Sequence, residues 1–161
     1  MKTIRLARPG DVDALLAIYA PYLSTTVTFE YVLPSREEFS RRIADVQARV
    51  PYLVLEEDGQ PVGYAYAHHW QPDPVYDLTW ELTMYLAHDI LGHGLGSRML
   101  ERLVDECRRG GAHVLVSCIT EGNAPCERMH LRAGFTRAGC IPETGFKFGR
   151  FLNDVINYRL L

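Results

Sequence analysis

Three glycines stand at alternate positions in residues 92–96, directly before a leucine-rich, charged segment. Glycine lets a backbone turn tightly and approach a ligand closely, because no Cβ intervenes. If a helix begins in this segment, several N–H donors and the positive end of the helix dipole meet in one place and favour a phosphate. The spacing therefore predicts a phosphate site on the backbone amides of Gly92, His93, Gly94, Leu95, Gly96 and Ser97.

Two familiar nucleotide-binding loops fit this segment poorly. It lacks the Gly-x-Gly-x-x-Gly spacing with a distant ribose-binding acid, and it has no Gly-Lys-Ser/Thr step to supply a phosphate-binding lysine. Dinucleotides and nucleoside triphosphates are therefore not favoured as ligands. A strand-to-helix turn without a ligand is the alternative that the loop alone leaves open.

A second chemical candidate is Glu81, in a segment whose side chains alternate between apolar and polar. The alternation over residues 78–86 predicts a strand with one apolar face and one polar face. Glu81 is the only carboxylate of the polar face. An ordinary carboxylate, with a pKa of about 4, is a weak base for an ammonium ion unless burial or a relaying water assists it. A solvated or salt-bridged strand residue is the alternative interpretation of Glu81.

Hydrophobic spacing and capping residues predict the elements that must hold these groups. A short first strand precedes a helix that Asp11 can cap, and a second helix begins at Ser35 with a capping box. The step Asp58-Gly59 predicts a hairpin between strands at 52–56 and 61–67. A further helix follows the glycine loop and ends at 110–111, a buried strand covers 114–119, a helix covers 123–133, and closing strands begin at 135.

This order of elements predicts an α/β protein with about seven strands and about four helices in mixed order. The chain of 161 residues is long enough for one sizeable core, and nothing marks an internal boundary, so we expect a single domain over residues 1–161.

Composition narrows the possible partners. The chain has 17 basic and 20 acidic residues and a net charge of -3, which argues against a nucleic-acid backbone as the partner. No apolar run is long enough to cross a bilayer and the start is polar, so we expect no membrane partner and a soluble, cytoplasmic protein. The four cysteines form no Cys-x-x-Cys pair and are expected to be free, buried thiols. His68 and His69 would point to opposite faces of a strand, so no metal is expected.

Taken together, the motifs resemble the Gcn5-related N-acetyltransferases (GNAT superfamily), and within it the phosphinothricin N-acetyltransferase group. The resemblance is carried by segments 4–8, 26–30, 63–65, 79–81, 84–86, 94–97 and 145–149, together with Asn123 and His130, so it covers nearly the whole chain. It implies the GNAT-like fold, with a central mixed, mostly antiparallel sheet and flanking helices. It also implies an enzyme that uses acetyl-CoA as co-substrate.

The resemblance further implies where acetyl-CoA would bind. The diphosphate would lie on the amides of residues 92–97, the pantetheine along Met84, Tyr85 and Leu86, and Asn123 and Cys126 would contact the cofactor near the end of the following strand. The family usually has polar or basic side chains where this chain has Leu91 and Gly92. We therefore expect weaker cofactor binding than in a relative with arginine there, and tighter binding after Gly92→Arg.

The same resemblance assigns the chemistry. Glu81 occupies the place of the general base, and the backbone N–H of Met84 or a neighbour would stabilise the tetrahedral oxyanion. His130 stands where many members have a tyrosine that protonates the leaving thiolate, so it would donate a proton or orient the thiol. A helix histidine that contacts a backbone carbonyl is the alternative. For Cys126 packing is preferred over a catalytic thiol, since no base is near in sequence.

The acceptor is expected to be a small amino-acid-like primary amine of the phosphinothricin or methionine sulfoximine type. Phe29, Glu30, Trp70 and Asp73 are candidates for its pocket, and core packing explains the two aromatic residues equally well. Gln71 and Asp73 stand where the group often has basic residues, which disfavours an anionic phosphinate and favours a neutral side chain. The aromatic segment 146–151 suggests a subunit interface, and relatives are commonly homodimers.

Two other functions remain open from the sequence. The same fold could acetylate a protein N-terminus or a polyamine, with Asp73 selecting a cationic partner. A non-catalytic acyl-CoA sensor would explain relaxed phosphate binding at Leu91 and Gly92, but it would need neither Glu81 nor His130.

Overall fold

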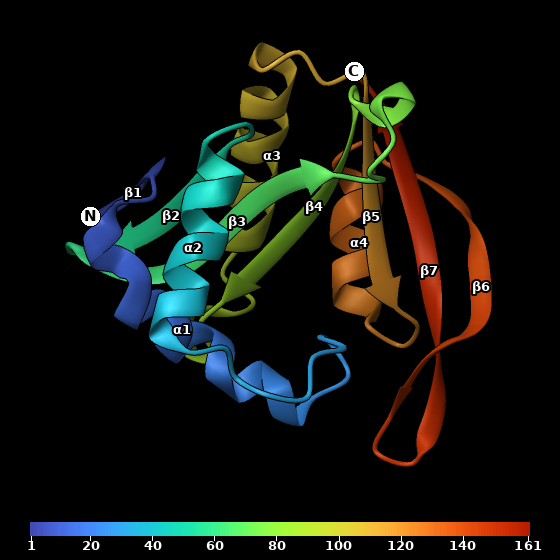
Figure 1. The fold of residues 1–161 in the computed structure, drawn as a ribbon, viewed down its shortest axis with the longest axis horizontal. Helices are drawn as coiled ribbons and strands as arrows, with labels where there is room; N and C mark the ends of the chain where they lie inside the picture. The colour runs from blue at the N-terminus through green and yellow to red at the C-terminus, as the bar shows by residue number, and fades with distance from the viewer.

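The computed structural model describes all residues 1–161 as one seven-stranded sheet with helices on both faces (Figure 1). The strand order is β1-β2-β3-β4-β5-β7-β6, and only the pair β4 and β5 is parallel. The sheet is thus mixed and mostly antiparallel, as predicted. The strands are β1 (Lys2–Leu6), β2 (Tyr52–Glu57), β3 (Gln60–His69), β4 (Thr79–Leu86), β5 (Val114–Thr120), β6 (Thr136–Lys147) and β7 (Arg150–Leu160).

The four predicted helices are present, two on each face of the sheet. They are α1 (Val12–Tyr19), α2 (Arg36–Gln47), α3 (Leu95–Arg109) and α4 (Ala124–Arg132). Alternate residues of β2 enter two separate hydrophobic clusters: Leu53 and Leu55 pack with α3, and Val54 packs with α1 and α2. The period of two along each strand therefore separates the two layers, which lie in front of and behind the sheet in Figure 1.

Local sequence signals set most element boundaries as expected. Ser35 caps α2 by accepting a hydrogen bond from the Glu38 N–H at 3.1 Å. Asp58 and Gly59 adopt φ angles of 50° and 82°, which is the left-handed geometry of a tight hairpin turn. Helix α3 ends at Gly110, and Gly134, with φ of 82°, follows α4.

The expected role of Asp11 as a helix cap was wrong. Its carboxylate accepts hydrogen bonds from both terminal nitrogens of Arg5, each at 2.8 Å, and from the Arg8 N–H at 2.7 Å. No N–H of α1 is bonded to it. The guanidinium comes from β1, so a tertiary ion pair has replaced the local cap. Hydrogen bonds from Arg5 hold the pKa of the buried Asp11 carboxyl below its usual range.

We predict that Asp11→Asn lowers the free energy of unfolding at pH 7 by about 2 kcal/mol, because a charge-assisted pair is lost. A carboxylate with a lowered pKa in the folded state stabilises the protein above its unfolded pKa of about 3.9, and this stability is lost as the pH falls through the lowered value. Urea unfolding at pH 7 and at pH 2.5 measures both effects. A difference between wild type and variant that is the same at the two pH values would contradict the assignment.

The parallel strands β4 and β5 are paired only at their starts. The register joins Thr79–Glu81 to Val114–Val116 and then ends, after which the two strands diverge (Figure 1). Both edges of this gap belong to central strands, so it opens a passage through the middle of the sheet. Residues Leu82–Leu86 of β4 and Ser117–Thr120 of β5 border it.

The gap also explains an error about the cysteines. All four are free, but only Cys107 is buried, whereas Cys118 and Cys140 are exposed. Cys118 lies beyond the last residue that pairs with β4, and Cys140 lies on the edge strand β6. The expectation of uniformly buried thiols was therefore wrong for these two.

Two further observations bear on the expected partners. None of the helices combines the length and the apolar character needed to span a membrane. No group of three or more histidine, cysteine, aspartate or glutamate side chains is arranged to hold a metal ion.

Candidate active site

The gap between β4 and β5 contains a cavity of about 350 Å³. It brings together seven of the residues that the sequence indicated, from three stretches of the chain. They are Phe29, Glu81, Met84, Tyr85, Asn123, Cys126 and His130. Residues separated by about one hundred positions in sequence thus share one site.

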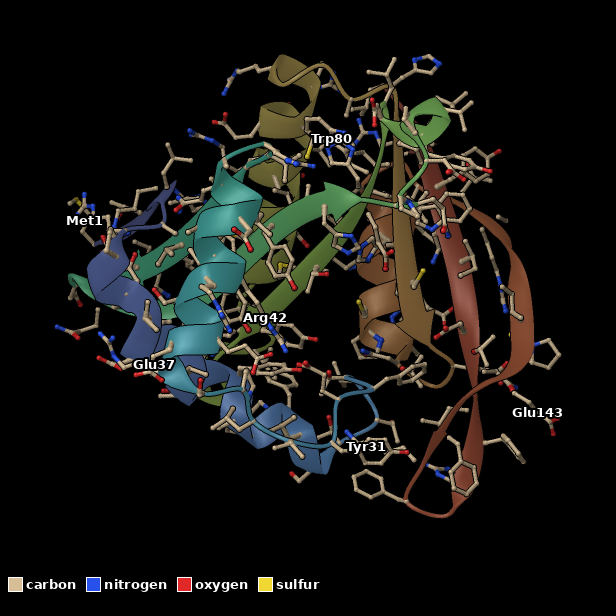
Figure 2. The ribbon with its side chains drawn as sticks, in the orientation of Figure 1. Met1, Tyr31, Glu37, Arg42, Trp80 and Glu143 are labelled. Atoms are coloured by element: carbon tan, nitrogen blue, oxygen red, sulfur yellow. The ribbon has the colours of Figure 1, made fainter.

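A second cavity, of about 510 Å³, lies on the face of the sheet that α2 covers. Thr28, Thr83 and Tyr85 line both cavities, so the two are neighbours across β4. The second is lined by tyrosines and by charged residues that include Glu30 and Arg42. In Figure 2 the labelled Arg42 lies beside α2, and its guanidinium donates to Glu30 at 2.7 Å. A ligand in this cavity would meet both hydroxyl groups and charges.

Glu81 lies where the two cavities approach each other. Its side chain is only 22% exposed, and a carboxylate oxygen lies 3.8 Å from Nε2 of His68. Although Cys118 is partly exposed, desolvation by the surrounding protein and, next, the Glu81 charge raise the pKa of its thiol to about 12, so this thiol stays protonated at neutral pH. Glu81 is therefore a partly desolvated anion that faces an open space, which is the setting a general base needs.

The strand pairing directs the amide of Met84 into the gap. The N–H of Trp70 bonds Thr79 O and the N–H of Ala87 bonds Val62 O, which marks these as the hydrogen-bonded pairs of β3 and β4. Such pairs alternate along an antiparallel ladder, so the pair of Ala65 and Met84 is non-hydrogen-bonded. The N–H of Met84 therefore points away from β3 and into the gap where β5 no longer pairs with β4. It is a fixed donor without a strand partner.

The glycine loop has the geometry of an anion site. Gly92 and Gly94 have φ angles of 84° and 74°, which favour glycine, and Gly94 directly precedes the first turn of α3. A Cβ on Gly96 would lie 3.0 Å from the sulfur of Met129, which is tighter than an ordinary contact, so this glycine favours close packing of α3 against α4. None of the N–H groups of residues 92–97 donates a hydrogen bond to the protein backbone or to a side chain. Six consecutive donors are thus open at the positive end of a 15-residue helix.

The loop lies beside the first cavity rather than within it. Its residues 92–94 are exposed, while Leu100 and Leu103 of α3 line the cavity wall. A ligand with its anionic part on the loop would have to extend along β4 to reach Glu81. Leu86, which was also expected to contact the cofactor, lines neither cavity, and its carbonyl accepts from Tyr22 Oη at 2.6 Å.

His130 and Cys126 face the cavity from α4. Nδ1 of His130 lies 2.9 Å from the carbonyl oxygen of Cys126, and the ring packs edge-on against Phe135. Burial lowers the pKa of His130, so the imidazole is neutral with Nδ1–H donating to that carbonyl. Burial also raises the pKa of the Cys126 thiol to about 11. Neither side chain is charged at neutral pH.

The loop between the short 3-10 helix η2 (Ala20–Ser24) and α2 closes the outer side of both cavities. Lys147, which is 1% exposed, donates from Nζ to the carbonyls of Thr25 and Thr28, each at 2.8 Å. Thr120 Oγ1 donates to Thr26 O at 2.7 Å. A lysine from β6 and a threonine from β5 therefore fix a wall of the site. In Figure 2 the labelled Tyr31 lies beside the end of the β6–β7 hairpin, where it bonds the carbonyl of Phe146.

Trp70 and Asp73 line neither cavity. Trp70 packs edge-on against Tyr76 in the connection between β3 and β4, and Asp73 is exposed. The structure does not bring these two candidates to the other site residues. The connection follows the end of β3, which lies opposite the start of β4, whereas the gap lies at the other end of β4.

Several residues of the site were missed by sequence reasoning. Thr83 lies two residues after Glu81, on the polar face of the same predicted strand, so this spacing could have predicted its place in the site. Asp154, whose pKa burial raises, and Cys118 carry no local signal, since their positions depend on the pairing of β5 with β7. His68 was considered only as a metal ligand.

Comparison with known families finds one match that covers most of the chain. Residues 4–156 match the acetyltransferase (GNAT) domain.

Individual relatives and structures agree with this match. A phosphinothricin N-acetyltransferase from Alcaligenes faecalis is 40% identical over 99% of this chain and 82% of its own length. An L-methionine sulfoximine/L-methionine sulfone acetyltransferase from Salmonella typhimurium is 36% identical over 94% of this chain and 90% of its own. The structure of a putative acetyltransferase from Salmonella typhimurium with its cofactor acetyl-CoA superimposes with a TM-score of 0.97 at 34% identity, and the match covers 100% of this chain and 94% of that one.

Proposed function

The chain belongs to the GNAT acetyltransferase family, and from this premise we propose that it transfers the acetyl group of acetyl-CoA to the primary amine of a small amino-acid-like substrate. The observation that carries this proposal is the pair of neighbouring cavities, with a partly buried carboxylate between them and open backbone amides on one side. A cofactor and an acceptor can approach Glu81 from opposite faces of the sheet.

Acetyl-CoA would be held mainly by backbone groups. The open amides of residues 92–97 suit its diphosphate, and the edge of β4 at Met84 and Tyr85 suits the amides of its pantetheine arm. The side chain of Asn123 caps no helix N–H and lines the cavity, so it is free to bond the same arm, with Cys126 beside it. Acetyl-CoA supplies an activated acetyl thioester; the protein supplies its orientation.

Glu81 is the proposed general base, and the N–H of Met84 is the proposed donor to the oxyanion. Direct attack of the amine on the thioester carbonyl needs a deprotonated nitrogen and a donor where negative charge develops. One amide in a water-excluded site contributes about 3 kcal/mol to such a transition state.

His130 fits an orienting role better than a proton-donating one. A neutral ring with Nδ1–H on the Cys126 carbonyl keeps only a lone pair on Nε2. Such a nitrogen accepts a hydrogen bond, from a bound water or from the thiol of the product. We propose that it holds the sulfur of coenzyme A in place after the C–S bond breaks.

The acceptor is proposed to be a neutral-side-chain amino acid or analogue, as in the sulfoximine and sulfone substrates by which one relative is named. Phe29 lines the first cavity and Glu30 the second, so both remain candidates for the acceptor pocket. We also propose a homodimer, since Phe146, Phe148 and Phe151 expose more than half of their surface on one hairpin. Four free cysteines fit a reducing, cytoplasmic setting.

Leu91→Arg is predicted to tighten the binding of acetyl-CoA by roughly tenfold, since it restores a cationic side chain beside the diphosphate. Leu91 is exposed and has φ of -64°, so arginine fits there without strain. Gly92 is the poorer place for the same test, because its φ of 84° penalises any side chain. Calorimetric titration of both variants measures the effect. A Leu91→Arg protein that binds no better than wild type would contradict the prediction.

A panel of amines tests the proposal as a whole. Release of free coenzyme A is followed by a thiol reagent in the presence of acetyl-CoA and each amine. Turnover with methionine sulfoximine, methionine sulfone or related amino acids supports the proposal. Selective turnover of peptides or polyamines would show that the acceptor is of that class and not an amino acid. Saturable acetyl-CoA binding without any turnover would favour a sensor.

A further inference from the structure

His68 lies directly beside the proposed base but has no assigned role. The register of the hairpin pairs His68 of β3 with Glu81 of β4, so their side chains share one face of the sheet. Nε2 of His68 lies 3.8 Å from a carboxylate oxygen of Glu81. Glu81 lines the first cavity and His68 lines the second. The imidazole therefore connects the base to a different, open part of the site.

The second nitrogen of the ring fixes which proton His68 carries. Nδ1 lies 3.1 Å from the carbonyl oxygen of His69, which can only accept a hydrogen bond. In the neutral ring the proton therefore sits on Nδ1. The lone pair is then on Nε2, the nitrogen nearer Glu81, so this ring is set to accept a proton from the carboxyl group.

His68 also has the better contact with solvent. Its side chain is 39% exposed, against 22% for Glu81. A cofactor in the first cavity would cover Glu81 further, while His68 still lines the second cavity. A proton held by Glu81 would then leave most directly through the ring.

Charged side chains of both signs lie around the second cavity. Glu81 from β4, Asp45 from α2 and Glu30 from the loop before α2 lie around the second cavity and its border, opposed by the guanidinium of Arg42. Arg42 is itself bonded to Glu30 at 2.7 Å. A histidine, with an ordinary pKa near 6.5, holds a proton more strongly than a glutamate, with one of about 4.3.

We propose that His68 is a relay residue that takes the acceptor's proton from Glu81 and passes it to solvent. This inference rests on the proposed acetyl transfer with Glu81 as base. The distance of 3.8 Å is spanned by a small side-chain rotation or by one bridging water. His68 itself touches neither the thioester nor the amine, so it acts through Glu81.

The proton balance of the reaction requires such an exit. An ammonium ion and a thioester become an amide and a thiol, so one proton leaves the site in each turnover. Glu81 removes this proton from the ammonium, His68 accepts it at Nε2, and the carboxylate is restored. The imidazolium then releases the proton from Nε2 to a water in the second cavity, while Nδ1–H stays bonded to the His69 carbonyl. The free amine then forms the C–N bond, the C–S bond breaks as the adduct collapses, and the second amine proton ends on the coenzyme thiolate.

The neighbouring His69 provides a matched control. It points to the other face of β3, where Nδ1 lies 3.7 Å from Asp77 and the ring lies 6.0 Å from Trp80. It has the same chemistry one residue away but no contact with Glu81. Its removal tests whether any effect at position 68 is merely structural.

The experiment compares His68→Ala, His68→Gln and His69→Ala by coenzyme A release with a turned-over amine. We expect His68→Ala and His68→Gln to lower kcat roughly tenfold, less than the loss of at least 10²-fold typical of removing a general base. Acceptor KM and acetyl-CoA affinity should stay within about twofold. External imidazole should restore most of the rate of His68→Ala through the space left by the ring, but not that of His68→Gln. His69→Ala should retain the wild-type kcat.

The Glu81→Gln background separates the relay from the base. Without a carboxylate there is no proton to pass on, so adding His68→Ala to Glu81→Gln should cause no further loss of kcat. A His68→Ala rate equal to wild type, or a loss that imidazole does not restore, would overturn the relay while leaving the proposed function intact. No coenzyme A release by wild type with any amine would overturn the proposed function, and the relay with it.

Discussion

Replacing Glu81 by glutamine is expected to lower kcat by between roughly 10²- and 10⁴-fold, the usual contribution of a general base. Glutamine keeps the size and hydrogen-bonding capacity of the side chain but cannot take a proton. The lower limit corresponds to about 2.7 kcal/mol of transition-state stabilisation. Since Glu81 lies near the start of β4 and the glycine loop follows the end of that strand, acetyl-CoA should bind the variant as tightly as wild type.

Two measurements check this result. Thiol release with a turned-over amine gives kcat, and calorimetry with acetyl-CoA gives the affinity of the same preparation. Asp154→Asn is the matched control, because this carboxyl lines the same cavity from β7. Asp154→Asn should reduce kcat far less than Glu81→Gln. Undiminished turnover by Glu81→Gln, or a larger loss in Asp154→Asn, would remove Glu81 from the mechanism.

Lys147→Met is expected to give the second large effect, on both stability and acceptor binding. Methionine fills a similar volume, but it leaves the carbonyls of Thr25 and Thr28 without their charged donor. Losing hydrogen bonds from a buried charged group costs about 2 to 3 kcal/mol. The loop at residues 25–30 forms a wall of both cavities, so its loosening should raise acceptor KM at least tenfold while acetyl-CoA affinity changes little.

Urea unfolding and steady-state kinetics measure the two consequences separately. Lys2→Met is the control, because Lys2 makes an exposed ion pair with Glu57 at 3.1 Å, and such pairs contribute little. It should leave both stability and kinetics near wild type. If Lys147→Met unfolded at lower urea but kept the wild-type acceptor KM, the lysine would be structural only and the loop would have no part in acceptor binding.

The sequence predicted the elements whose signals are local. The Ser35 cap, the Asp58-Gly59 turn and the hydrophobic spacing of α3 each act within a few positions, and the structure has these elements as expected. The resemblance to the GNAT superfamily, carried by motifs along the whole chain, is confirmed by the family match over residues 4–156.

The errors concern residues whose role depends on distant partners. Asp11 is a residue type that often caps a helix, but its carboxylate oxygens accept from the Arg5 guanidinium of β1 and not from an N–H of α1. Burial of Lys147 could not be read from an aromatic, charged segment, since its acceptors lie about 120 residues away. The contact of His68 with Glu81 depends on the register of the β3–β4 hairpin, and a shift of one residue would have placed His69 there instead.

For the site, too, the sequence indicated the residues that have local patterns and missed those whose position depends on distant pairing. Glycine spacing indicated the loop and strand alternation put Glu81 on a polar face, because both patterns are local, whereas Met84 came from the family resemblance. Trp70 and Asp73 were placed by analogy in a connection whose path the sequence does not determine. The two-cavity arrangement itself follows from the early end of the pairing between β4 and β5, which no local pattern encodes.

The most direct test of the central claim is calorimetric titration of the folded protein with coenzyme A and, in parallel, with pantetheine, which lacks the diphosphate. If the open amides of residues 92–97 hold that group, coenzyme A should give saturable heat and bind at least about 100-fold more tightly than pantetheine, a difference near 2.7 kcal/mol. No association with coenzyme A, or equal affinity for the two ligands, would contradict the claim.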